Sequence, residues 1–269
     1  MTKTRPLAAL VLLLAGSALA QAQPAAPAAP AAPAQPAKPA KAEKPKVYDE
    51  SADGAKQIAD ALAKAKKNNR RVLVQWGANW CGWCIALHGL YKSDAKISHE
   101  LLYEYDVVAI DVGQFNKHMD LAEKYGADLK KNGLPFLTVL DADGKPLVNQ
   151  ETSSLENKQD PATAGEKLGH DPAKVLALLK KYEATPQDGN AVLSAALAKA
   201  TKEDKKVFLH FGAPWCGWCH KLEDWMATPA IASLLAKDYV DCKIDMDRDK
   251  NAAEIAKKFG KDEKGGIPW

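Results

Sequence analysis

Apolar residues recur along the chain in two blocks that repeat the same order of elements. Each block begins with an Ala- and Lys-rich stretch, residues 54–67 and 189–202, in which apolar side chains recur at the three- and four-residue spacing of a helix. A mostly apolar run follows each stretch, at 72–76 and 207–211, and predicts a strand. The pattern therefore predicts a helix and then a strand at the start of both blocks.

Beyond that strand, both blocks continue with a helical segment, a second strand and a charged helix. The expected bounds are 107–112 and 240–244 for the second strands, and 117–125 and 250–259 for the charged helices. The first block alone continues, with a strand at 136–140, a hairpin turn through Gly144, a return strand at 146–149, a polar loop at 150–169 and a closing amphipathic helix at 172–182. Since Trp269 stands one residue past the corresponding proline, we expect the second copy to be incomplete.

The two blocks are copies of one repeat. RRVLVQWGANWCGWC (70–84) aligns with KKVFLHFGAPWCGWC (205–219), and eight of fifteen positions are identical. A proline follows the last cysteine of each segment at a similar distance, 51 residues to Pro135 and 49 residues to Pro268. Both prolines come after a glycine-containing turn, so the resemblance extends well beyond the cysteine motif.

The first residues have the pattern of a secretory signal peptide. Lys3 and Arg5 precede a short apolar run at 7–15, and small residues follow. This order predicts a signal peptide at 1–20, with cleavage after Ala22 as the alternative. A buried or anchoring helix is the competing interpretation, and an uncleaved anchor would place the protein in the same compartment. We therefore expect a periplasmic or secreted protein.

Residues 21–46 consist almost entirely of Ala, Pro and Lys. The segment has no apolar periodicity from which a core could form, and Pro-rich chains adopt extended, semi-rigid conformations. We interpret it as a disordered tether.

Composition and charge exclude several classes of protein. The chain has 269 residues, of which 46% are hydrophobic and 26% are charged, as in soluble globular proteins. Its net charge of +3 comes from residues 1–46, which hold six basic residues and one acidic residue, so the remainder is nearly neutral. That balance argues against a nucleic-acid partner. No apolar run is long enough for a transmembrane span, and five cysteines are too few for a disulfide-stapled miniprotein.

The candidate chemistry lies in the two Cys-Gly-Trp-Cys motifs. Each motif follows a strand and begins a helix, where unpaired N–H groups stabilise the thiolate of the first cysteine, Cys81 or Cys216. The second cysteine, Cys84 or Cys219, lies one turn further on, close enough to attack a mixed disulfide on the first. One such motif is weak evidence, but two in the same context favour thiol–disulfide exchange.

These segments resemble the thioredoxin superfamily. WCGWCHKLE (215–223) and LPFLTVLDADGK (134–145) are similar, more narrowly, to bacterial periplasmic thioredoxin-like proteins with a WCGWC motif. The resemblance implies an α/β fold, with two tandem thioredoxin-like domains at 47–183 and 184–269, each a central mixed sheet flanked by helices, the second truncated. By position, the resemblance implies that Cys81 and Cys216 are the attacking cysteines and that Cys84 and Cys219 are the resolving cysteines. It also implies that Pro135 and Pro268 are the cis-prolines.

The chain departs from this pattern at two positions in each copy. Thioredoxins place a buried acid six residues before the first cysteine, where it helps to deprotonate the resolving thiol, but here Gln75 and His210 stand there. Gln has no group that accepts a proton, whereas His acts as a base if its pKa suits. Thioredoxins also carry proline directly before the second cysteine, where this chain has Trp83 and Trp218. The direction of electron flow therefore does not follow from the motif.

Other roles for these cysteines stay open. A Zn²⁺ site made by all four is awkward because 131 residues separate the pairs, and a structural disulfide in each copy is the stronger alternative. Cys242 alternates with apolar neighbours and is interpreted as a buried strand thiol. Residues 245–249 lack the later ligands of a Ca²⁺ loop. Four histidines have no ligand-like spacing and are interpreted as surface residues: His88, His99, His118 and His170.

Two functions are compatible with these motifs. The first is an enzyme, a thiol–disulfide oxidoreductase of the cell envelope that acts on protein thiols or disulfides and needs a redox recycling partner. The second is a non-catalytic binding module with the same fold, in which the cysteines form structural disulfides or hold a metal. For the enzyme we expect no cofactor and no metal.

Overall fold

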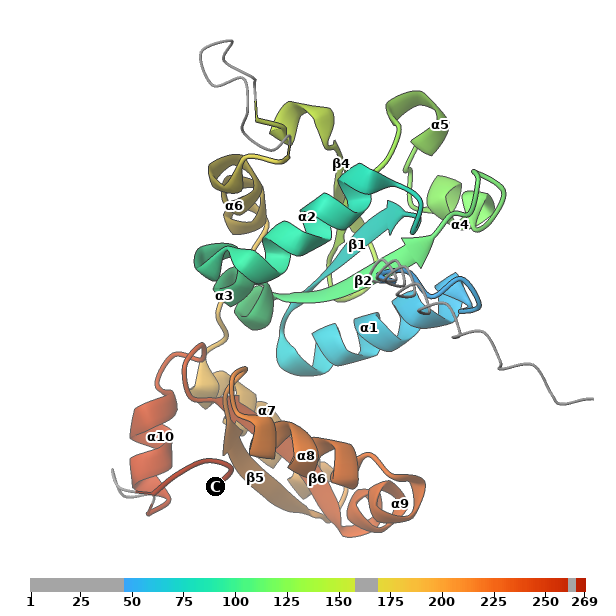
Figure 1. Cartoon of the computed structure of the whole chain (residues 1–269). Coiled ribbons are helices and arrows are strands. Elements are labelled where there is room, and N and C mark those ends of the chain that lie inside the picture. The colour runs from blue at the N-terminus through green and yellow to red at the C-terminus, as the bar shows by residue number, and fades with distance from the viewer. Residues whose placement is uncertain (1–45, 158–168, 261–264) are drawn as a thin grey trace, which may run out of the picture. The chain divides into compact units, whose positions relative to one another are not determined.

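The first copy of the repeat folds into a mixed four-stranded sheet with helices on both faces (Figure 1). The strands are β1 (Arg71–Gly77), β2 (Tyr105–Asp111), β3 (Phe136–Leu140) and β4 (Pro146–Glu151), in the order β2-β1-β3-β4. β1 and β2 are parallel, and the other neighbours are antiparallel. This computed structural model describes residues 46–157, 169–260 and 265–269; the expected signal peptide at 1–20 and residues 21–45 of the expected tether lie outside them.

Helices of the first copy cover both faces of this sheet. They are α1 (Gly54–Asn68), α2 (Gly82–Ser93), α3 (Ala95–Glu104), α4 (Met119–Lys124), α5 (Leu129–Asn132) and α6 (Pro172–Lys181). Side chains of α1, α4 and α5 form a core with one face of the sheet, and side chains of α2, α3 and α6 form a second core with the other face. The central strand β1 is buried along almost its whole length because it lies between these two cores.

Aspartates begin several of these helices. The carboxylates of Asp53, Asp94 and Asp171 accept hydrogen bonds from backbone N–H groups in the first turns of α1, α3 and α6. Asp94 also ends α2, so the single helical segment expected after the motif is two helices. The hairpin between β3 and β4 is as predicted, with Gly144 at φ +85° and its N–H bonded to the Asp141 carbonyl.

Two predicted segments differ from the structure. The charged helix expected at 117–125 is shorter, because Gly113, Phe115 and His118 adopt left-handed φ values that delay its start. The loop expected at 150–169 contains the end of β4 and a 3₁₀ turn, Ser153–Leu155; residues 158–168 of it lie outside the described ranges.

The second copy begins with the same elements as the first. They are α7 (Gly189–Lys202), β5 (Lys206–Gly212), α8 (Gly217–Met226), α9 (Pro229–Asp238), β6 (Tyr239–Asp245) and α10 (Ala252–Lys258). β5 and β6 are parallel, and α7 and α10 pack with them in a core of their own. Among the residues that the structure describes, this sheet has only two strands.

A single residue pair marks where the third strand of the second copy would begin. The Phe211 N–H donates to the Trp269 carbonyl at 2.7 Å, and the Trp269 N–H donates back to the Phe211 carbonyl at 3.4 Å. In the first copy, Trp76 pairs with Phe136 in the antiparallel register of β1 and β3. Trp269 therefore occupies the position that opens the antiparallel half of the sheet.

No helix within the described ranges is long and apolar enough to cross a membrane.

Candidate redox site at the Cys-Gly-Trp-Cys motifs

The first cysteine of each motif is the residue that caps the following helix. Cys81 precedes α2 and Cys216 precedes α8, both with extended backbone. The sulfur of each accepts the N–H of the second cysteine, at 3.2 Å for Cys84 and 3.1 Å for Cys219. The helix N-terminus therefore directs a backbone donor at this sulfur, which is the arrangement that stabilises a thiolate.

Each motif contains a disulfide bond in this structure. Cys81 is bonded to Cys84 and Cys216 to Cys219, with 5.3 Å between the Cα atoms in both. The first cysteine of each motif is nearly buried, since Cys81 is 6% exposed and Cys216 is 4% exposed. The indole between the cysteines differs between the motifs, because Trp218 is 70% exposed whereas Trp83 is partly buried.

The two prolines that follow the motifs have the expected geometry. The Leu134–Pro135 and Ile267–Pro268 peptide bonds are both cis. Leu134 packs against the cluster formed by Tyr48, Cys81 and Cys84, and the Ile267 carbonyl oxygen lies 3.6 Å from the Cys216 sulfur. The fold thus places the residue before each proline near the disulfide.

Gln75 lies beneath the first motif at the position where an acid was expected. Its side chain is fully buried, and its Nε2 donates to the Cys84 carbonyl at 3.1 Å and to the Tyr48 hydroxyl at 2.5 Å. Tyr48 is not among the residues that the sequence predicts for the site. A lone aromatic residue at the end of a Pro-rich segment has no periodic pattern that would place it in a core, so the sequence offers no signal for this contact.

His210 occupies the same place beneath the second motif. Its imidazole is buried, and Nε2 lies 2.9 Å from a carboxylate oxygen of Asp241. Burial, the largest single influence, acts to raise the pKa of Asp241, but the hydrogen bond and charge of His210 together with the charge of Lys67 hold that pKa below its usual value. The second motif therefore rests on an acid–base pair, whereas the first rests on a neutral amide.

A nearby ion pair also distinguishes the second motif. Lys243 Nζ lies 2.6 Å from Glu223 Oε1, and both side chains are nearly buried. A Cβ on Gly212 would meet both the Cys219 sulfur and the Lys243 side chain at about van der Waals distance, 3.5 Å and 3.6 Å. The resolving cysteine of this copy thus lies close to a lysine stem.

Comparison with known proteins assigns both copies. Residues 58–163 match a family model described as "Thioredoxin-like domain", and residues 173–268 match one described as "Protein of unknown function, DUF255". The match over residues 58–163 is to a thioredoxin-like domain, as the motifs of the first copy predict. The resemblance carried by its motifs is therefore confirmed.

Several curated relatives are named as protein disulfide-isomerases. "Protein disulfide-isomerase tigA" of Aspergillus niger is 26% identical over 188 residues, which cover 70% of this chain and 48% of that protein. "Spermatogenesis-associated protein 20" of Homo sapiens is 32% identical over 75 residues, 28% of this chain and 10% of that protein. The chain thus spans about half the length of the disulfide-isomerases it matches first.

Solved structures with similarity to the chain include a disulphide isomerase and an oxidoreductase. A disulphide isomerase from Xylella fastidiosa Temecula1 is 28% identical and has a TM-score of 0.42, covering 51% of this chain and 96% of that one. A structure named DsbH oxidoreductase is 23% identical with a TM-score of 0.31, covering 46% of this chain and 78% of that one.

Two of the histidines predicted to lie on the surface make internal contacts instead. His170 is buried with its ring 5.6 Å from that of Trp83, and burial lowers the pKa of this histidine. His118 links two elements, because its Nε2 accepts the Gly54 N–H and its Nδ1 donates to the Asp111 carbonyl. The contact of His170 with Trp83 and that of His118 with Gly54 join segments far apart in the sequence, so spacing along the chain does not reveal them.

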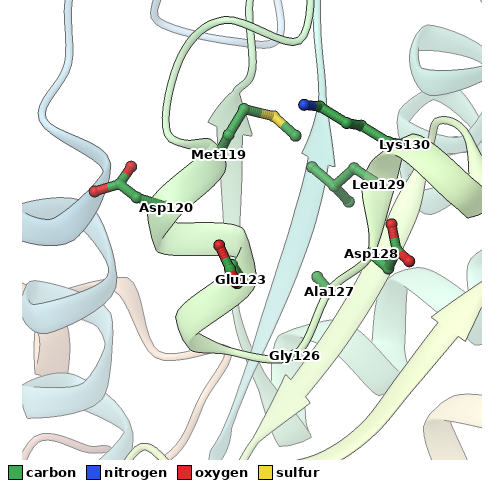
Figure 2. Close-up of a pocket in the computed structure, with 8 residues that line it drawn as sticks. All are labelled: Met119, Asp120, Glu123, Gly126, Ala127, Asp128, Leu129 and Lys130. Atoms are coloured by element: carbon green, nitrogen blue, oxygen red, sulfur yellow. The ribbon is translucent and has the colours of Figure 1, made fainter.

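The remaining candidate positions lie away from the two motifs. Cys242 is a buried free thiol, as expected, and burial raises its pKa to about 11. A pocket of about 530 Å³ lies between α4 and α5 and contains no motif residue (Figure 2). The described residues include no cluster of three or more His, Cys, Asp or Glu side chains arranged to hold a metal ion.

Proposed function

We propose that this chain is a thiol–disulfide oxidoreductase that exchanges disulfides with cysteines of other proteins. The observation that carries the proposal is the geometry repeated at both motifs: a disulfide at a helix N-terminus, with the first sulfur as the cap and a cis-proline peptide beside it. The names of the curated relatives support the same reaction class.

The reduced first motif would act in two steps. The Cys81 thiolate attacks a substrate disulfide, forms a mixed disulfide and releases one substrate sulfur as a thiolate. The Cys84 thiolate then attacks the Cys81 sulfur, and the second substrate sulfur leaves with the electron pair and takes a proton from water. Two electrons pass to the substrate, and the Cys81–Cys84 disulfide remains. A dithiol donor, the redox recycling partner, must reduce it again. Cys216 and Cys219 take the same roles in the second copy.

The compartment and the domain boundaries are part of the proposal. The charged, apolar and small residues of 1–20 support a periplasmic or secreted location, and residues 21–46 would tether the folded part. The boundary between 47–183 and 184–269 is supported by the cores, since every hydrophobic cluster draws its residues from one of these ranges alone.

One observation favours the alternative of a non-catalytic binding module. All four motif cysteines are nearly buried, as suits disulfides that only stabilise the fold. The bonded residues are only three apart, however, and closing so short a loop removes little chain entropy from the unfolded state. The geometry therefore favours exchange over a structural role.

Turnover distinguishes the two functions. Reduction of insulin driven by dithiothreitol is measured with the full chain, with Cys81→Ser, with Cys216→Ser and with both together. An oxidoreductase accelerates the reaction, and the double variant returns it to the rate without protein. An unchanged rate with the wild-type chain would show that the motifs do not turn over.

A further inference from the structure

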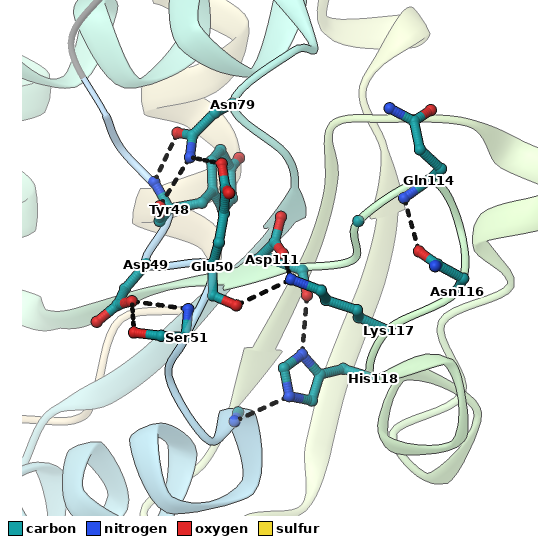
Figure 3. Close-up of polar contacts among 12 residues, drawn as sticks. Tyr48, Asp49, Glu50, Ser51, Asn79, Asp111, Gln114, Asn116, Lys117 and His118 are labelled. Carbon is teal, nitrogen blue, oxygen red and sulfur yellow. Dashed lines mark hydrogen bonds and ion pairs between the residues drawn. The ribbon is translucent and has the colours of Figure 1, made fainter. Parts of the chain in front are cut away.

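A short segment ahead of α1 crosses the loop that leads into the first motif. In this segment, residues 47–53, the N–H groups of Val47 and Tyr48 both donate to Asn79 Oδ1 at 3.0 Å (Figure 3). Asn79 Nδ2 donates in return to the Tyr48 carbonyl at 2.8 Å and to the Glu50 carboxylate at 2.9 Å. One side chain, two residues before Cys81, therefore fixes the segment by both of its polar atoms.

A lysine holds the same segment further along. Lys117 Nζ donates to the Glu50 carbonyl at 2.9 Å and lies 3.2 Å from a carboxylate oxygen of Asp111 (Figure 3). Asp111 ends β2 and its side chain is only 3% exposed. The segment is thus bound to the motif loop at one point and to the end of the sheet at another.

These contacts place the Tyr48 ring beneath the first motif. Tyr48 is 1% exposed, and its hydroxyl accepts the Gln75 amide N–H. The direction of this bond is determined, because the same Nε2 donates to the Cys84 carbonyl, which only accepts. The hydroxyl proton of Tyr48 is therefore left free to donate elsewhere.

The resolving sulfur and that hydroxyl both lie close to Gly77. A Cβ built on Gly77 would lie 2.2 Å from the Tyr48 oxygen and 2.8 Å from the Cys84 sulfur, so both atoms flank one point above this glycine. We propose that the Tyr48 hydroxyl donates a hydrogen bond to the Cys84 thiolate while that thiolate resolves the mixed disulfide. This inference rests on the proposed function and names the group that assists its second step.

Such a donor would assist the resolving step. A buried thiolate has lost its hydration, and Gln75 has no group that accepts the thiol proton. A hydrogen bond from a phenol stabilises the thiolate, so Cys84 loses its proton to water at a lower pH. Tyr48 keeps its own proton, consistent with the burial that raises its pKa. The ionisable groups that interact with Tyr48 are Asp111, which Lys117 pairs, and the neutral phenol of Tyr91.

The assistance belongs to the first motif alone. The second motif has Pro214 where the first has Asn79, and proline has no amide to hold a crossing segment. There, His210 paired with Asp241 occupies the place of Gln75. The two resolving cysteines thus have chemically different neighbours.

The pKa of Cys84 is the direct readout. It is measured from the pH dependence of alkylation, followed by mass spectrometry, in a full chain in which Cys81, Cys216 and Cys219 are serine. We expect Tyr48→Phe to raise this pKa, so that Cys84 alkylation at neutral pH slows about tenfold, the effect of a hydrogen bond to a charged group. Tyr91→Phe is the matched control: it removes another buried hydroxyl, one without a partner, and should leave the Cys84 profile unchanged.

Turnover separates this inference from the proposed function. In a full chain in which only Cys216 and Cys219 are serine, Tyr48→Phe should slow resolution of the mixed disulfide and leave its formation by Cys81 unchanged. Asn79→Ala, which releases the segment but keeps the phenol, should slow the same step. An unaltered Cys84 pKa in Tyr48→Phe would overturn the inference whether or not the protein turns over. Absence of turnover in the parent, with the pKa shift intact, would instead overturn the proposed function.

Discussion

The Gln75 side chain donates its amide N–H to the backbone carbonyl of Cys84, 3.1 Å away. This contact joins the centre of β1 to the first turn of the helix that carries the motif. Gln75 thereby holds the resolving cysteine in place but contributes no base. An acidic residue at this position could both position the resolving cysteine and accept its proton. Gln75 does only the first.

Gln75→Asp should therefore raise turnover by the first motif, measured by insulin reduction in a chain in which Cys216 and Cys219 are serine. A well-placed base typically accelerates proton transfer by roughly 10²-fold or more. Stability should fall, because the Cys84 carbonyl loses its donor and a charge is buried. Gln75→Asn is the control, because the asparagine side chain has the same length as that of aspartate but carries no carboxylate. An equal or lower rate in a folded Asp variant would mean that proton release does not limit turnover.

Gly77→Ala should destabilise the protein by about 1–3 kcal/mol, because the added methyl would lie 2.2 Å from the Tyr48 hydroxyl. Adding Tyr48→Phe should restore part of this loss by removing the obstructing oxygen. Gly89→Ala in α2 is the control, since a Cβ there meets nothing within 4 Å. Thermal unfolding measures all four proteins. Equal melting temperatures for Gly77→Ala and Gly89→Ala would contradict the packing described for Tyr48.

Glu100→Gln should stabilise the protein at alkaline pH. Burial, together with the neighbouring Glu183, raises the pKa of Glu100 to about 7. The folded state then binds this proton more tightly than the unfolded state, in which the pKa is about 4.3, so the free energy of unfolding falls as pH rises between these values. The gain in melting temperature should be larger near pH 8 than near pH 5. Exposed Glu123→Gln should show no such difference, and a pH-independent gain for Glu100→Gln would refute the linkage.

Cys242 should resist alkylation in the folded protein. Its side chain is 2% exposed and its pKa is raised to about 11, so little thiolate is present or reachable near neutral pH. Iodoacetamide added with both disulfides intact should label Cys242 only after a denaturant is added. Rapid labelling without denaturant would show that β6 is open to solvent.

The regular elements followed from local patterns, and the contacts around the motifs did not. The short apolar run placed β3 at its observed bounds, Phe136–Leu140, because a strand that is buried on both faces is specified by its own residues. Asp94 could have revealed the break between α2 and α3, since aspartate is a common helix cap. The burial of Tyr48, in contrast, depends on Asn79, 31 residues away, and no periodicity encodes such a pairing.

Trapping of the mixed disulfide tests the central claim most directly. In a chain in which Cys216 and Cys219 are serine, Cys84→Ser leaves Cys81 able to attack a disulfide-containing protein but removes the resolving thiol, whereas Cys81→Ser removes the attacking thiol. Each reduced variant is mixed with oxidised insulin, and mass spectrometry identifies the cysteine bonded to it. We expect an adduct at Cys81 that accumulates in Cys84→Ser and none in Cys81→Ser. An adduct at Cys84 in Cys81→Ser, or no adduct in either variant, would contradict the proposed roles of the two cysteines.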